Sequence, residues 1–129
     1  MKKKILLIDD DEDLLRSFQV ILESNGLEVI TALDGKTGYS KLKNENPDLL
    51  VLDVMMRSDL EGYNLLHTIK KEPEYKEKPI ILLTGMLDKL GVNLYPGVED
   101  ESMFPNVRFQ DKPVDPNVLV QMIWEMLKE

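Results

Sequence analysis

The chain has 129 residues, 43% hydrophobic and 31% charged, which fits one globular domain with a core of ordinary size. Its 16 basic and 24 acidic residues give a formal net charge of −8, which opposes binding to nucleic-acid phosphates and to anionic lipid. The absence of cysteine excludes disulfides and thiol chemistry, and no apolar run approaches the roughly 18 residues of a membrane span. We therefore expect a single cytoplasmic domain over residues 1–129 that binds neither membrane nor nucleic acid directly.

In the first half of the chain, short apolar runs alternate with segments of helical period, which is the pattern of strand–helix–strand units in a parallel sheet. Strands are expected at residues 5–8, 27–32 and 48–52. The first intervening helix should end at Asn25-Gly26, because glycine favours the left-handed turn that closes a helix. Residues 35–44 predict a second, weaker helix, since Gly38 lies inside it.

The second half of the chain predicts two more strands and two more helices. A helix is expected at residues 63–71, a strand at 79–83 and a more polar strand at 106–110. Asp115-Pro116 predicts the start of the last helix, because aspartate caps a helix and proline is tolerated in its first turn.

The interval between Met86 and Pro105 departs from this alternation. It contains two glycines, two prolines and a run of three acidic residues. Because glycine and proline both disfavour the interior of a helix, we expect a loop there with at most a short helix.

Carboxylates follow two of the predicted strands. Asp9 and Asp10 come directly after the first strand, and Asp53 comes directly after the third. Two carboxylates about 5 Å apart repel by roughly 3 kcal/mol at an effective dielectric constant near 20, so packing them at one edge of a sheet calls for a cation. No histidine or cysteine lies near these residues in the sequence, and oxygen ligands alone favour Mg2+ before Ca2+ and disfavour zinc.

The order of these features resembles the receiver domain of two-component response regulators across essentially the whole chain. The matching positions lie at the ends of four strands and are Asp9, Asp10, Asp53, Thr84 and Lys112, the last followed by Pro113. The resemblance implies an α/β, flavodoxin-like (βα)5 fold with a doubly wound parallel sheet of strand order 2-1-3-4-5 and an irregular or shortened fourth helix region. In that order the first and third strands are neighbours, which brings the three aspartates into one crevice.

The resemblance also implies a role for each residue of the site. Asp53 would be the phosphoacceptor, a carboxylate that takes a phosphoryl group from a phosphohistidine and holds it as an acyl phosphate. Asp10, Asp53 and the backbone carbonyl of Met55 would bind Mg2+, and Asp9 would act on the ion through water. Lys112 would pair with Asp53 or with the new phosphate.

Two residues would carry the signal outward. Thr84 would donate its hydroxyl to a phosphate oxygen, and the ring of Phe109 would turn inward when Thr84 moves. The family thus implies a signalling domain that catalyses its own phosphorylation and dephosphorylation, rather than a conventional enzyme. A sensor histidine kinase or phosphotransfer protein would act before it and a downstream protein target after it.

The chain departs from the family pattern in two places. Where the family usually has Met-Pro after the acceptor, this chain has Met56-Arg57, and Gly62 comes nine residues after Asp53 instead of eight. The acceptor loop is therefore expected to be one residue longer. The segment between the fourth strand and Lys112 is also several residues longer than usual, so the family's partner surface does not carry over.

Two other functions remain open at this point. A receiver-like scaffold that is never phosphorylated would fit the unusual loops, although it has no chemical need for all five matching residues. A phosphohydrolase of the haloacid dehalogenase type would use the Asp-x-Asp pattern of Asp9 and Asp11 with Thr84 and Lys112. It lacks an acidic metal motif after the lysine, and the chain is short for that fold.

Overall fold

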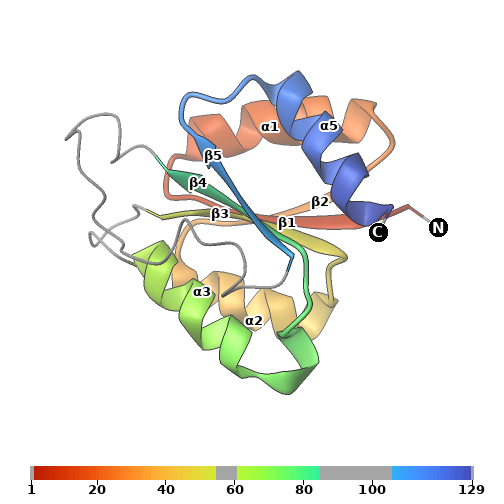
Figure 1. The fold of residues 1–129 in the computed structure, drawn as a ribbon. Helices are drawn as coiled ribbons and strands as arrows, with labels where there is room; N and C mark the ends of the chain where they lie inside the picture. Colours follow the sequence, from red (N-terminus) through yellow and green to blue (C-terminus); the bar gives the residue numbers. More distant parts are fainter. Residues whose placement is uncertain (1, 55–60, 85–105, 129) are drawn as a thin grey trace.

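A computed structural model describes residues 2–54, 61–84 and 106–128 (Figure 1). The strands are β1 (Lys4–Ile8), β2 (Glu28–Ala32), β3 (Leu49–Asp53), β4 (Ile80–Thr84) and β5 (Val107–Asp111). The described helices are α1 (Glu12–Ser24), α2 (Gly35–Glu45), α3 (Glu61–Lys71), the short 3-10 helix η1 (Pro73–Tyr75) and α5 (Pro116–Leu127).

All five strands are parallel and form one sheet in the order β2-β1-β3-β4-β5. This confirms the expected fold class and strand order, and each strand lies within one residue of its expected position. The sequence did not predict η1, in which Pro73 opens the turn and the Tyr75 side chain is buried. The interval from Met86 to Pro105 lies outside the described residues.

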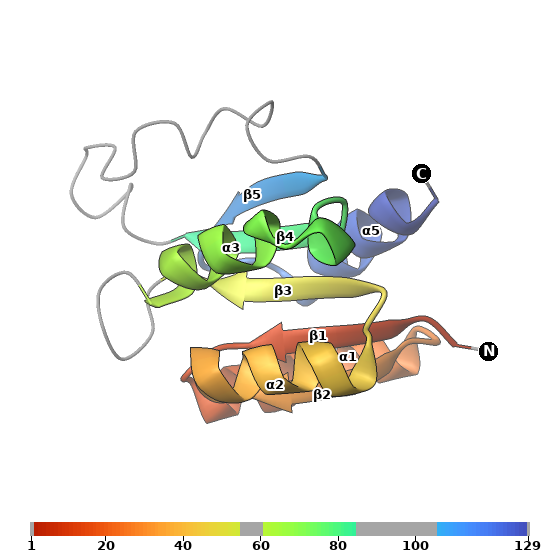
Figure 2. The ribbon, with the colours of Figure 1, turned by 90° about the horizontal axis from the view of Figure 1, so that it is seen from below.

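Helices cover the sheet on both faces. Figure 1 shows α1 and α5 on one face and α2 and α3 on the other, and Figure 2 shows the second pair lying side by side. Side chains of β1 alternate between the two layers, so that Leu6 and Ile8 pack under α2 and α3 while Ile5 and Leu7 pack under α1 and α5. This two-residue period follows from the pleat of a strand whose two faces are both buried.

Aspartates begin three of the described helices. The carboxylates of Asp11, Asp34 and Asp115 accept hydrogen bonds from backbone N–H groups in the first turns of α1, α2 and α5. Each carboxylate satisfies a donor that has no partner inside the helix. The start predicted at Asp115 is thereby confirmed.

The helix expected at residues 35–44 forms, and α2 runs through Gly38 to Glu45. A methyl group at Gly38 would stand 2.5 Å from Cδ1 of Ile8 in β1. Glycine therefore allows the helix to lie close against the strand that leads to Asp9, which is a packing requirement that helix propensity does not measure.

Lysine side chains hold the turns at the amino ends of β3 and β4. The Lys70 ammonium at the end of α3 donates to the carbonyl oxygens of Lys76 at 2.9 Å and Lys78 at 2.7 Å. The Lys78 ammonium in turn donates to the carbonyl oxygen of Pro47 at 2.6 Å, just before β3. Side-chain ammonium groups thus donate hydrogen bonds to backbone carbonyls of these turns.

The outer edge of β2 is covered by a side chain of α2. Lys41 donates from Nζ to the carbonyl oxygen of Thr31 at 2.6 Å. As for membranes, no helix in the described part of the chain has the length and apolar character of a bilayer-crossing segment.

Candidate functional site

The topology brings the predicted acidic residues together at the carboxyl edge of the sheet. β1 and β3 are hydrogen-bonded neighbours, and Asp9 and Asp53 each come one residue beyond the aligned pair Ile8 and Leu52. Carboxylate oxygens of Asp9, Asp10 and Asp53 all lie within 4.8 Å of one another. The three carboxylates expected to meet beside the first and third strands therefore lie together.

The three carboxylates differ in exposure. Asp9 and Asp53 are each only 3% exposed, while Asp10 faces solvent. The Asp9 backbone N–H donates to the carbonyl oxygen of Ala32 at 3.1 Å, and its Oδ1 accepts from the backbone N–H of Asp11 at 3.0 Å. The bond from Asp11 holds one carboxylate oxygen of Asp9, and the other, Oδ2, faces the Lys112 ammonium.

Lys112 supplies a positive charge between the two buried aspartates. Its Nζ lies 2.9 Å from Oδ2 of Asp9 and 3.2 Å from Oδ2 of Asp53. The pairing with Asp53 was expected from the resemblance, whereas the shorter contact with Asp9 was not. No sequence pattern indicates that contact, because it depends on where the turn after β5 places the lysine.

The electrostatic balance keeps this lysine charged. Burial by itself lowers the pKa of the Lys112 ammonium, but the hydrogen bond to Asp9 and the negative charges of Asp53 and Asp9 together raise that pKa above its ordinary value of 10.5. Lys112 is therefore a permanent cation of the site at neutral pH.

The donor set fits a hard divalent cation. Three carboxylates carry three negative charges and the Lys112 ammonium offsets one, so two negative charges remain. Every side-chain donor is an oxygen atom, which suits Mg2+ or Ca2+ and not zinc. Met55, whose carbonyl was expected to complete the set, lies outside the described residues.

The two predicted switch residues lie on the neighbouring strands. Thr84 is the last residue of β4, at the same edge of the sheet, and is aligned with Asp111 of β5. Phe109 is aligned with Leu82 and is half-buried against the core beneath α2 and α3. Its position is compatible with both packing and switching, and its turning inward stays a prediction.

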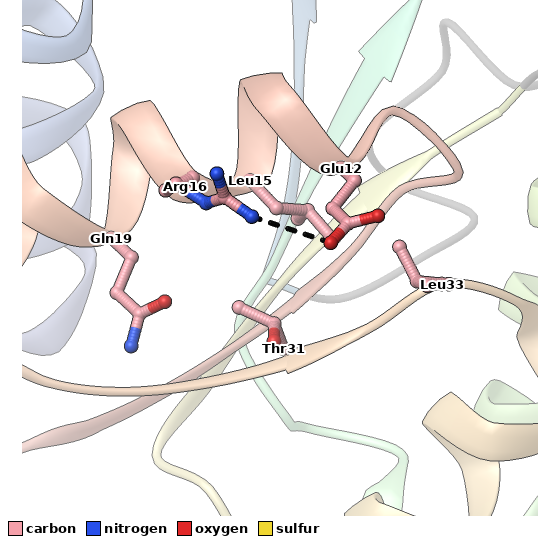
Figure 3. A pocket seen from close by; sticks show the side chains of 6 residues that line it. All are labelled: Glu12, Leu15, Arg16, Gln19, Thr31 and Leu33. Atoms are coloured by element: carbon pink, nitrogen blue, oxygen red, sulfur yellow. Dashed lines mark hydrogen bonds and ion pairs between the residues drawn. The ribbon is translucent and has the colours of Figure 1, made fainter.

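A separate hollow beside α1 contains none of the residues predicted for the site. It has a volume of about 210 Å3 and is lined by Glu12, Leu15, Arg16, Gln19, Thr31 and Leu33 (Figure 3). The guanidinium of Arg16 pairs with Glu12 at 3.4 Å within the same helix. Arg16 and Glu12 are largely exposed and the other polar lining residues, Gln19 and Thr31, are half-buried, so no polar side chain that lines the hollow is fully buried.

The fold and the acidic edge together define a class of α/β domains with a carboxylate and cation site at the switch point of the sheet. The chain matches the family model for the response regulator receiver domain over residues 5–123. It therefore belongs to the response regulator receiver family. The resemblance inferred from the strand-end residues is thereby confirmed.

Several curated proteins are similar to this chain. Protein PilG of Pseudomonas aeruginosa is 34% identical over 89 residues, which cover 67% of this chain and 65% of PilG. The alkaline phosphatase synthesis transcriptional regulatory protein PhoP of Bacillus subtilis is 40% identical over 66% of this chain and 34% of its own length. The probable transcriptional regulator ycf27 of Porphyridium aerugineum is 41% identical over 67% of this chain, and the match spans only 35% of that protein.

Solved structures agree with this assignment. A CheY-like response regulator receiver domain protein from Methanospirillum hungatei is 31% identical, with a TM-score of 0.82 over 99% of this chain and 95% of that one. Chemotaxis protein CheY4 of Vibrio cholerae shares the fold with a TM-score of 0.80 at 23% identity. The chain is thus a receiver domain of two-component signalling, and a phosphoacceptor role is consistent with this membership.

Proposed function

We propose that the chain accepts a phosphoryl group on Asp53 in a Mg2+-dependent reaction. The observation that carries the proposal is the buried Asp53 carboxylate at the end of β3, 3.2 Å from the Lys112 ammonium and grouped with Asp9 and Asp10. A buried carboxylate that shares a cation with another carboxylate has a fixed direction, as a nucleophile requires.

In the proposed reaction an Asp53 oxygen attacks the phosphorus atom of a phosphohistidine. A P–O bond forms, the P–N bond breaks, and its electron pair leaves with the imidazole of the donor. Asp10 and Asp53, with the carbonyl of Met55, would hold Mg2+, and Asp9 would act on the ion through water. The ion would supply positive charge that offsets the negative charge of the transferring phosphoryl oxygens.

Lys112 has two tasks in this proposal. Before transfer its ammonium holds Asp53 and Asp9 at the distances given above, which reduces the repulsion between their carboxylates. After transfer the same ammonium pairs with a phosphoryl oxygen. Its raised pKa supports both tasks, because the charge persists at neutral pH.

The same proposal assigns the two switch residues. Thr84 donates its hydroxyl to a phosphoryl oxygen, and Phe109 moves further into the core beneath α2 and α3. Support comes from their positions, since Thr84 ends β4 next to the strand of Asp53 and Phe109 lies on the adjacent β5. The donor is a histidine kinase or phosphotransfer protein, the output is a protein target, and the domain acts in the cytoplasm.

Intact-protein mass spectrometry tests the proposal. Incubation with acetyl phosphate or phosphoramidate and Mg2+ should add one phosphoryl group of about 80 Da, and omitting Mg2+ should abolish the gain. Asp53→Asn should take no adduct, while Asp115→Asn, at the exposed start of α5, serves as a matched control. An adduct that persists on Asp53→Asn contradicts the assignment, and an unmodified parent chain would favour the scaffold function.

A further inference from the structure

We propose that Gly62 is the positioning residue that sets the location of Asp53. This inference rests on the proposed function. The first turn of α3 packs directly against the backbone of Asp53, the acceptor residue of that proposal. Any side chain at position 62 therefore displaces Asp53. Neither the aspartate cluster nor the Lys112 contacts include this residue.

The contact between Gly62 and the end of β3 is made by backbone atoms. The Gly62 N–H donates to the carbonyl oxygen of Val54 at 3.0 Å. A methyl group added at Gly62 would lie 1.7 Å from the carbonyl oxygen of Asp53, 2.6 Å from its carbonyl carbon and 2.8 Å from Cα of Val54. No rotation of a side chain can relieve these overlaps, because all three atoms belong to the main chain.

The end of β3 has little freedom to move away. β3 lies between β1 and β4 and is hydrogen-bonded to both. Immediately after Asp53, the N–H of Val54 donates to the carbonyl oxygen of Leu83 at 3.0 Å. Moving the Asp53 carbonyl therefore strains the sheet at the point where the site is built.

The helix has little freedom either. Leu66 and Ile69 of α3 are fully buried in the core beneath α2 and α3, and Leu65 is nearly so. Interiors are packed closely enough that an added methyl group is accommodated by shifts of backbone and side chains. With both the strand and the helix held, the overlap has to be shared between them, and Asp53 moves.

Gly38 shows what an ordinary close contact looks like in the same molecule. A methyl group there would meet only the side chain of Ile8, at 2.5 Å for Cδ1 and 2.9 Å for Cγ1. A smaller side chain at position 8 could relieve that overlap, whereas no substitution relieves the one at Gly62. The distinction between side-chain and backbone obstruction is what marks Gly62 as a positioning residue.

Gly62→Ala tests the inference through its Mg2+ affinity, measured by calorimetric titration of folded protein. Residues that orient metal ligands typically change affinity by about 10- to 100-fold, so we expect at least roughly tenfold weaker binding. Gly26→Ala is the matched control. Gly26 has φ of 86° and nothing within 4 Å of an added methyl group, so this change strains the backbone far from the site. It should lower stability and leave Mg2+ affinity within about twofold, because its methyl group contacts no part of the site.

Mg2+ affinity of Gly62→Ala within twofold of the parent value would overturn the inference, while phosphorylation of the parent chain would leave the proposed function standing. A parent chain that takes no phosphoryl group would instead remove the proposed function.

If Gly62→Ala does not fold, Ile69→Val and Ile123→Val replace it, since each removes one methylene-sized group from a fully buried isoleucine. Loosening α3 with Ile69→Val should change Mg2+ affinity measurably and Ile123→Val in α5 should not; equal effects would contradict the inference.

Discussion

At the scale of single residues, the site is governed by how one ammonium is shared between two carboxylates. Lys112 lies closer to Asp9 than to Asp53, at 2.9 Å against 3.2 Å. Asp9 therefore helps to set the position of the Lys112 ammonium. A Lys112 that is shared in this way partly neutralises the same carboxylates that a divalent ion would bind.

Replacing Lys112 should separate metal binding from phosphoryl transfer. In Lys112→Gln the carboxylates lose a nearby positive charge, so Mg2+ should bind more tightly. A unit charge about 4 Å away is worth roughly 1 kcal/mol or more, which corresponds to about fivefold or more in affinity. Phosphorylation by acetyl phosphate should nevertheless slow. Calorimetry and intact mass measure the two effects, and weaker Mg2+ binding would show that Lys112 helps to build the metal site.

At the scale of elements, the acidic residues at the carboxyl edge of the sheet could be predicted from the sequence. The lysine contacts at the amino edge could not. The strands are short apolar runs and an aspartate follows two of them, and the strand order that the receiver resemblance implied placed these aspartates together. Lys70 and Lys78 carry no such signal, because lysine in a polar turn is usually solvated. Only the folded chain shows that their ammonium groups hold carbonyls before β3 and β4.

The Lys70 contact predicts a pH-dependent stability. Burial lowers the pKa of Lys70 to about 8 from 10.5, Glu77 opposes this and Lys78 adds to it. Between about pH 8 and 10.5 the unfolded chain therefore holds a proton that the folded chain has released, so this residue's contribution to stability rises with pH. Because Lys70 is only half-buried, screening limits the gain to about 1 kcal/mol or less.

Urea unfolding at several pH values measures this contribution as the free energy of unfolding of the parent chain minus that of Lys70→Met. The difference should grow in favour of the parent from pH 7.5 to 10, in line with about 1 kcal/mol or less of linkage. Lys71→Met, at the exposed neighbouring position of α3, controls for the loss of a lysine from this helix. A flat difference would mean that Lys70 is solvated and not held by the turn.

At the scale of the whole molecule, fold and chemistry depend on the same strand order. Placing β1 beside β3 brings together two strands whose apolar side chains are buried, and it also gathers the aspartates. This much followed from the sequence. The seating of Gly62 and the Asp9 contact of Lys112 did not, because both depend on backbone placement at the ends of elements rather than on residue type.

Because the acidic edge carries uncompensated negative charge, Mg2+ should stabilise the folded chain. At a concentration tenfold above its Kd, an ion that binds only the folded state adds about 1.4 kcal/mol, which raises the Tm by several degrees for a domain of this size. Chelation should reverse the shift. Asp10→Asn should raise the Tm without Mg2+ and show a smaller response to it, measured against sodium chloride of equal ionic strength.

The hydrogen bond from Lys41 at the outer edge of β2 affects whether separate copies of the protein can associate through that edge. An edge strand offers unpaired backbone groups to any extended segment, and contact there leads to sheet growth and aggregation. A strand that pairs with this edge would have to break the 2.6 Å hydrogen bond between the Lys41 ammonium and the Thr31 carbonyl oxygen. It would then have to bury the ammonium charge or displace the lysine side chain. The bond from Lys41 therefore disfavours pairing between the β2 edges of two copies of this protein at that carbonyl.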